Sequence, residues 1–344
     1  MEAQRLHVML VTEMAHIRYL SGFSGSYGIC AISADKQVLI TDYRYKDQVK
    51  EEVEEYKIVI SKRDLLSTLI DKKIFPLHTN IGFESQHLSI ADLSRFKKIL
   101  PKRRFVPTFS FIENIAAIKD ENEIEMIRMA SSISDKVFQK ILPCIHHGVR
   151  ECEIAGEISY YHRYYGAESD AFEPIVASGI RSAFPHSRAS EKKITDGEMV
   201  VLDFGCKYRG YHSDLTRTIS VGKPLAEMKK IHQIVCNAQQ RTIDRTAEGI
   251  TASSIDFAAR NYIKENKYGR YFNHSLGHGI GIHLHEPIDI SERSSTILKK
   301  DNVITIEPGI YLPAKWGVRI EDMIVVKDFG CEVLTQAPKE LISV

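Results

Sequence analysis

Apolar and polar positions follow two alternating patterns along the first third of the chain. Short apolar runs are typical of buried strands, and the charged segments between them have the spacing of amphipathic helices. The predicted strands are 8–12, 28–33, 37–42, 56–61, 80–85 and 104–107, and the predicted helices are 43–55, 63–73 and 89–100. Because strands and helices alternate, we assign residues 1–112 to a small α/β domain.

The pattern changes after residue 112, where long amphipathic helices begin. Residues 119–142 carry apolar side chains at helical spacing, with no glycine or proline before Pro143. Further helices are predicted over 151–166, from Pro224 to Gly249 and over 251–266. Strand-like segments lie between and after these helices, so residues 113–344 are expected to form an α+β domain with an antiparallel sheet.

Composition excludes several classes of protein. The formal net charge is +1 and both signs are mixed along the chain, which does not favour a nucleic-acid surface. No apolar stretch approaches the length of a membrane span. None of the six cysteines forms a CxxC pair, so we expect reduced thiols and a cytoplasmic protein.

Candidate chemistry lies in the last 142 positions, where four carboxylates and one imidazole interrupt strand-like segments. They are Asp203, Asp214, His278, Glu307 and Glu321. Carboxylates are uncommon in strands and costly to bury unless they are paired or bind a metal. Because four carboxylates balance the charge of two divalent cations, the set predicts a dinuclear metal site.

Single motifs leave other interpretations open. Asp203 and Asp214 could be turn acids at strand ends, and Glu307 before Pro308 could equally be a turn residue. The glycines around His278 could mark a bulge or a close backbone approach. The arrangement in two hairpins favours the metal, since Asp203 and Asp214 lie on one and Glu307 and Glu321 lie on the other.

At these residues the chain resembles the pita-bread metallopeptidases, within them the branch of Xaa-Pro aminopeptidase (aminopeptidase P) and Xaa-Pro dipeptidase (prolidase). The five motifs VLDFG, YHSDLTRT, SLGHGIG, VITIEPGIY and GVRIEDMIVV occur in the family order. The segment IRYLSGFSGSYG at 17–28 is similar to the creatinase-type N-terminal domain of that branch. The resemblance implies a creatinase-like α/β domain followed by a pita-bread catalytic domain.

The resemblance also implies roles for individual residues. The five residues would bind two divalent cations, with Mn²⁺ favoured and Co²⁺ or Zn²⁺ as alternatives. The catalytic candidates are His186, His285, Glu307 and Arg319, and His274 is the candidate for substrate contact. Arg319 precedes Glu321 by two positions, which puts both side chains on one face of a strand. A homodimer is expected by analogy with the family.

The implied reaction is hydrolysis of the bond between an N-terminal residue and a following proline. Asp289 occupies the position where some dipeptide-specific relatives carry an arginine, eleven residues after the metal-binding histidine. A carboxylate there would repel the free carboxylate of a dipeptide, so the sequence favours an Xaa-Pro aminopeptidase that cleaves longer peptides. The alternatives are a prolidase, a methionine aminopeptidase-like enzyme and a non-catalytic pita-bread binding protein.

Overall fold

The computed structural model describes residues 5–71 and 74–344 of the chain. The chain divides into two compact units, 1–116 and 117–344, so the division falls a few residues after the predicted one at residue 112. Each unit is described below by itself. None of the described helices is long and apolar enough to span a membrane.

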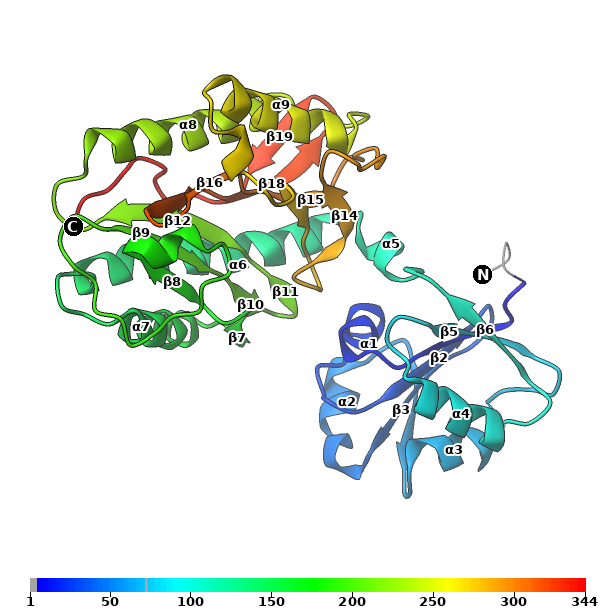
Figure 1. The fold of residues 1–344 in the computed structure, drawn as a ribbon. Coiled ribbons are helices and arrows are strands. Elements are labelled where there is room, and N and C mark those ends of the chain that lie inside the picture. The colour runs from blue at the N-terminus through cyan, green and yellow to red at the C-terminus, as the bar shows by residue number, and fades with distance from the viewer. Residues whose placement is uncertain (1–4, 72–73) are drawn as a thin grey trace. The chain divides into compact units, whose positions relative to one another are not determined.

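One mixed sheet forms the centre of the first unit in its described part (Figure 1). Its strands are β1 (Val8–Val11), β2 (Ile29–Ser33), β3 (Gln37–Asp42), β4 (Lys57–Ser61), β5 (Asn80–Glu84) and β6 (Arg104–Thr108), in the order β4-β3-β2-β1-β5-β6. Strands β1, β2 and β3 pair antiparallel, whereas β1–β5, β5–β6 and β3–β4 pair parallel. All six predicted strands are therefore confirmed.

Helices cover both faces of this sheet because successive strand side chains point to opposite faces. Val8 and Leu10 of β1 pack with α3 (Leu65–Asp71) and α4 (Ile90–Ile99). Met9 and Val11 pack in a second cluster with Ile17 and the helices on the other face. Those helices are α1 (Met14–Ser21) and α2 (Gln48–Glu52).

The predicted helices of this unit are only partly right in extent. A 3₁₀ turn η2 (Tyr43–Tyr45) and α2 divide the helix that was predicted over 43–55. The last two residues of the helix predicted over 63–73 lie outside the described residues. Helix α1 was not predicted, because its eight residues are too few to display a helical period clearly. A short helix α5 (Glu113–Ala116) ends the unit.

In the second unit, one helical layer packs on a three-stranded sheet. Helices α6 (Glu121–Ile141) and α7 (Glu151–Tyr164) share a core with β8 (Ile175–Ser178), β9 (Met199–Phe204) and β12 (Leu215–Ser220). The strands pair antiparallel in the order β12-β9-β8. The short strands β7 (Ser169–Asp170), β10 (Cys206–Tyr208) and β11 (Tyr211–His212) form a small sheet that continues from β9.

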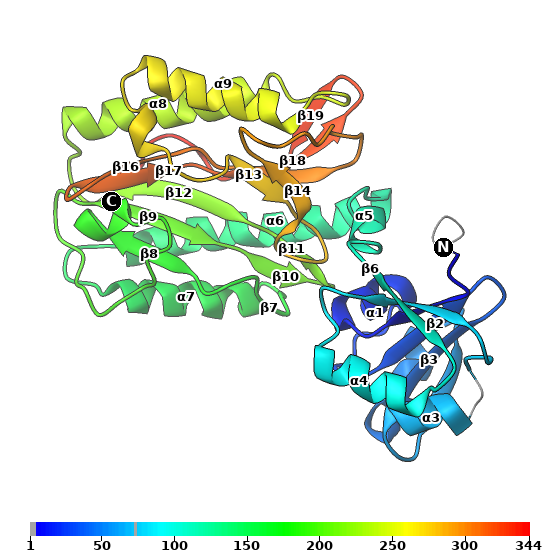
Figure 2. The same ribbon diagram turned by 45° about the vertical axis from the view of Figure 1, so that its right-hand side comes forward.

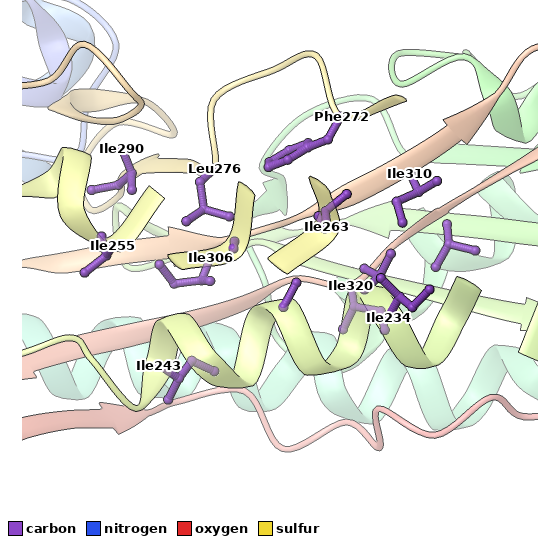
Figure 3. Packing of buried hydrophobic residues seen from close by; sticks show 14 of the residues in the cluster. Ile234, Ile243, Ile255, Ile263, Phe272, Leu276, Ile290, Ile306, Ile310 and Ile320 are labelled. Atoms are coloured by element: carbon purple, nitrogen blue, oxygen red, sulfur yellow. The ribbon is translucent and has the colours of Figure 1, made fainter. Parts of the chain in front are cut away.

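A second helical layer packs on the remaining strands, as Figure 2 shows. Helices α8 (Ala226–Ile243) and α9 (Ala252–Glu265) cover these strands. They are β13 (Gly277–Gly279), β14 (Glu286–Ile290), β15 (Val303–Ile306), β16 (Gly309–Leu312), β17 (Trp316–Arg319), β18 (Asp322–Lys327) and β19 (Gly330–Val333). Figure 3 shows Ile234 of α8 and Ile263 of α9 packing near Ile306, Ile310 and Ile320.

The two sets of strands meet at a bridge between Thr216 of β12 and Glu321, which directly precedes β18. The amide of Glu321 donates a 3.0 Å hydrogen bond to the carbonyl of Thr216. This connection brings the two predicted carboxylate hairpins together within the α+β unit.

Candidate metal centre

The five predicted ligands lie in strands or at strand ends of the second unit. Asp203 belongs to β9 and His278 to β13. Asp214 directly precedes β12, Glu307 directly follows β15 and Glu321 directly precedes β18. Pro308 ends the pairing after Glu307, because proline has no amide hydrogen to donate.

The structure brings these side chains together from distant parts of the chain. Asp214, His278 and Glu321 each offer one ligand atom within 4.8 Å of the others. Nε2 of His278 lies 3.7 Å from Oδ2 of Asp214 and 3.6 Å from Oε1 of Glu307. Such a cluster of oxygen and nitrogen ligands suits a divalent cation.

Three buried carboxylate oxygens provide a test of whether metals fit. Oδ1 of Asp203, Oδ1 of Asp214 and Oε1 of Glu321 have no hydrogen-bond donor among the described residues. Leaving a buried carboxylate oxygen without a partner is energetically unfavourable. Because all three belong to predicted ligands, the residues present fit a metal centre.

The pKa values of the clustered carboxylates also favour a metal centre. Burial, followed by repulsion from Asp203 and Glu307, raises the pKa of Asp214 well above its ordinary value. Burial, followed by repulsion from Asp214, also raises the pKa of Glu321 well above its ordinary value. Burial raises the pKa of Glu307 to about 8. The carboxylates are thus packed closely enough that they require either protons or cations to coexist.

The ring of His278 is oriented for metal binding. Its Nδ1 lies 3.0 Å from the Gly279 carbonyl and must donate there, so the Nε2 lone pair faces the carboxylates. Burial, followed by the effect of His285, lowers the pKa of His278 to about 4, which keeps the ring neutral at pH 7. A Cβ on Gly277 would lie 2.0 Å from the Thr305 carbonyl oxygen, so glycine permits this approach of β13 to β15.

Arg319 is the buried cation of the site and is only 3% exposed. Its guanidinium donates to Oδ2 of Asp203, to the Tyr311 hydroxyl at 2.7 Å and to the Pro185 carbonyl at 3.2 Å. These contacts place Arg319 at the candidate site, and its catalytic role stays a prediction. The guanidinium holds one oxygen of Asp203 and leaves the other for a cation.

Tyr311 connects Arg319 to His274 and was not identified from the sequence. Nδ1 of His274 lies 2.7 Å from the Ser275 carbonyl and must donate there. Nε2 of His274 therefore accepts from the Tyr311 hydroxyl at 3.0 Å. Burial, followed by repulsion from Arg319, lowers the pKa of His274 to about 3. The sequence signal that could have identified Tyr311 is its position four residues after Glu307, in the predicted hairpin.

A cavity of about 310 Å³ opens beside the ligands. Its wall includes Pro185, His186, Asp203, His274, Ser275, Gly277, His278, His285, Asp289, Glu307 and Arg319. The structure thus places all the predicted catalytic and substrate-contact residues around one cavity. Asp214 and Glu321 are outside this lining set and are 5% and 2% exposed.

Two family models match the chain. Residues 125–328 match metallopeptidase family M24, and residues 1–118 match the creatinase/prolidase N-terminal domain. The Xaa-Pro dipeptidase of Pyrococcus horikoshii is 37% identical over 349 residues, which cover 99% of this chain and 96% of that protein.

Solved structures show the same architecture over the full chain. An Xaa-Pro dipeptidase from Bacillus anthracis has a TM-score of 0.96 at 40% identity, covering 100% of this chain and 96% of that one. An X-Pro aminopeptidase from Thermotoga maritima has a TM-score of 0.93 at 38% identity, covering 100% and 99%. The predicted combination of a creatinase-type domain and a pita-bread catalytic domain is therefore confirmed.

Proposed function

This chain belongs to metallopeptidase family M24, and we propose that it hydrolyses Xaa-Pro dipeptides at the bond before proline. The observation that carries this proposal is the convergence of Asp214, His278 and Glu321 beside an open cavity. The relatives named as Xaa-Pro dipeptidases support the substrate class. Proline forms a tertiary amide without an N–H, which explains the need for a dedicated site.

The preference for dipeptides corrects the interpretation based on Asp289. Relatives of both kinds match the chain, and the dipeptidases are the better-supported reading. Asp289 does line the cavity, but it is exposed and its Oδ2 accepts from the Ser291 hydroxyl. Solvent therefore screens its charge, so the repulsion that was expected from a dry site is weak.

A cation for the dipeptide carboxylate lies in an adjoining hollow. This hollow shares His274 and Ser275 with the main cavity and also contains Arg260 and Arg293. Arg260 is already paired with Asp256. The side chain of Arg293 has no hydrogen-bond or ion-pair partner among the described residues, so we assign it to the substrate carboxylate.

The five ligands would hold two divalent cations, which supply charge stabilisation at the scissile carbonyl and activate water when bound. Mn²⁺ is proposed because four of the five ligands offer hard carboxylate oxygens. Arg319 keeps Asp203 in place through their buried contact. Thr216 does the same for Glu321 through a 2.6 Å hydrogen bond from its hydroxyl.

His285 and His186 are placed to act on the substrate. Both line the cavity, and the His285 ring lies 4.3 Å from that of His278, measured between ring centroids. Burial and the nearby His186 lower the pKa of His285, so it stays neutral at pH 7 and has one N–H to donate. We assign that N–H to the carbonyl oxygen as negative charge develops there.

Glu307 is the proposed proton carrier. Its side chain is 18% exposed and lines the cavity, unlike the more deeply buried Asp214 and Glu321. A carboxyl group in that position can receive a proton and deliver it to the proline nitrogen as the bond breaks. His274 keeps its assignment to substrate contact, although both ring nitrogens already bond within the protein.

The test is a kinetic comparison with Mn²⁺ present. We expect kcat/KM to be higher for an Xaa-Pro dipeptide than for its Xaa-Pro-Yaa extension, with an Xaa-Ala dipeptide as the control for proline. A clear preference for the extended peptide would restore the aminopeptidase reading. Measuring the mass of the native protein and its cellular location would test the homodimer and the cytoplasmic location, which stay predictions.

A further inference from the structure

Glu151, in the first turn of α7, is a fully buried carboxylate that lies outside the cavity described above. Its Oε1 accepts from both the amide and the hydroxyl of Ser178, each at 2.8 Å. Its Oε2 accepts from Nε of Arg181 at 2.9 Å and from the amide and hydroxyl of Ser190 at 3.2 and 2.6 Å. Five donors therefore satisfy one buried charge.

These donors all come from the segment 178–190, which we call the His186 loop. Ser178 and Ser190 lie at its two ends, and Pro185 and His186 within it line the cavity. Apart from the 3₁₀ turn η4 (Gly179–Ala183), the loop has no regular structure after Ser178. Its conformation therefore depends on contacts with the rest of the unit.

The other side of the loop is held by the strand that carries Arg319. The Ser182 hydroxyl accepts from the amide of Gly317 at 2.9 Å, and the Pro185 carbonyl accepts from Arg319 at 3.2 Å. On the side of α7, Glu151 connects the two ends of the loop by accepting hydrogen bonds from both Ser178 and Ser190. His186 lies between these two attachments and lines the cavity.

A role for Glu151 in its own helix does not explain this arrangement. Acidic residues in a first turn commonly stabilise the helix through its dipole. Glu153, two residues later, already caps α7, since its side chain accepts from the amide of Arg150 at 2.8 Å. The side-chain hydrogen bonds of Glu151 go to the His186 loop instead.

We propose that Glu151 is a positioning residue that holds His186 against the substrate cavity; this inference rests on the proposed function. Replacing the carboxylate with an amide would turn one acceptor oxygen into an NH₂ group that faces donors. If the NH₂ group replaces Oε1, the two contacts from Ser178 lose their acceptor, and if it replaces Oε2, the three contacts from Arg181 and Ser190 do. The loop would open, and His186 would leave its place.

A double-mutant cycle tests whether Glu151 acts through His186. We expect Glu151→Gln alone to lower kcat/KM by about 10-fold or more, as displacement of a substrate-facing group does. In the His186→Ala background the same change should cost less than about twofold, because the group it positions is already absent. In the His285→Ala background it should retain its full cost.

Glu153→Gln is the matched control, because it removes a carboxylate from the same helical turn without touching the loop. It should leave kcat/KM and the loop unchanged. Hydrogen exchange of the amides in 178–190 supplies a readout that needs no substrate. Exchange there should become faster in Glu151→Gln and stay unchanged in Glu153→Gln.

The possible results separate this inference from the proposed function. Independent, multiplying effects of Glu151→Gln and His186→Ala, a fully active His186→Ala, or unchanged exchange in the loop would each overturn it. If only the proposed function is wrong, the wild-type protein will lack Xaa-Pro activity. Hydrogen exchange in 178–190 will still be faster in Glu151→Gln. Should that variant not fold, Ser190→Ala removes the 2.6 Å contact more mildly and must shift both readouts in the same direction.

Discussion

The Thr216 hydroxyl donates a 2.6 Å hydrogen bond to Oε2 of Glu321 at the point where the two sets of strands meet. Both groups are buried, and the other oxygen of Glu321 has no donor among the residues that the structure describes. One oxygen is thus fixed by the protein while the other is left for a cation. The architecture and the metal chemistry depend on the same contact.

Thr216→Val should weaken metal binding while the fold is kept, because valine fills the same space and lacks the hydroxyl. We expect about 10-fold weaker binding of Mn²⁺, the lower end of what loss of a partner to a ligand costs. Titration calorimetry on metal-stripped protein measures it. Thr242→Val is the matched control, since Thr242 is equally buried but its hydroxyl donates to the Ala238 carbonyl within α8. Equal affinity in the two variants would contradict the role given to Thr216.

Asp214→Asn should lose metal and activity together. Removing one charge from the four carboxylates leaves two cations insufficiently neutralised. Elemental analysis should show fewer than two metals per chain, with an unchanged circular dichroism spectrum. Asp289→Asn is the control, because Asp289 also lines the cavity but is exposed and is not a proposed ligand. Two bound metals and near-normal turnover in Asp214→Asn would refute the dinuclear centre.

His285→Ala should lower kcat by about 10²-fold with both metals retained, as expected for loss of a hydrogen bond made in the transition state. Steady-state kinetics and metal content must be measured on the same preparation. A variant whose main defect is lost metal would make His285 a ligand. Unchanged kinetics would remove it from the mechanism.

Arg293→Ala should raise KM for Xaa-Pro dipeptides by about 10-fold, the effect of losing one charge-assisted contact. Extended Xaa-Pro-Yaa peptides have their carboxylate elsewhere, so their KM should change little. Arg293→Lys keeps the charge and should restore part of the affinity. Equal changes for both peptide lengths would show that Arg293 does not bind the dipeptide carboxylate.

His232 should make the protein less stable in acid. Burial, followed by repulsion from Arg217, lowers its pKa from 6.5 to about 4. In the unfolded chain the ring takes up a proton near pH 6.5, but in the folded protein only near pH 4. The contribution of His232 to the free energy of unfolding is therefore fully present above pH 6.5 and is lost as the pH falls toward 4. The total loss is about 3.5 kcal/mol, at about 1.4 kcal/mol per pKa unit of difference.

Urea unfolding at pH 7.5 and pH 5 measures this effect in the wild type and in His232→Leu. The variant should lose less stability between the two pH values, whatever its stability at pH 7.5. Other buried histidines titrate in both proteins, so the difference isolates His232. Identical losses would mean that His232 is protonated in the folded protein.

The candidate metal ligands could be singled out from the sequence because acidic and imidazole side chains are unexpected next to or within strand-like apolar segments. Asp203 in a fully buried strand and His278 between two glycines stand out without knowledge of the fold. The strands could also be predicted from the sequence, because each one is a local run of apolar residues. The positions where β12 and β18 begin, next to Asp214 and Glu321, and where β15 ends, next to Glu307, depend on pairing between distant segments and could not be predicted.

Apart from Arg319, most of the supporting residues could not be predicted, because their partners are far away in the sequence. Lys119 and Glu286 form a buried ion pair across 167 positions. Glu151 looks like an ordinary first-turn acid until the loop that it binds is seen. Local patterns contain no information about such contacts, so they show which residues do chemistry but not what holds those residues in place.

The crowding of carboxylates described for the metal centre has a consequence for how the protein is loaded. Because burial raises the pKa of Glu307 to about 8 and also raises the pKa values of Asp214 and Glu321, the metal-free site would bind protons more tightly than separate carboxylates do. Each cation that enters must expel them, so uptake acidifies a weakly buffered solution and apparent affinity rises with pH. We therefore expect metal binding at this centre to be coupled to proton release and to weaken as the pH falls.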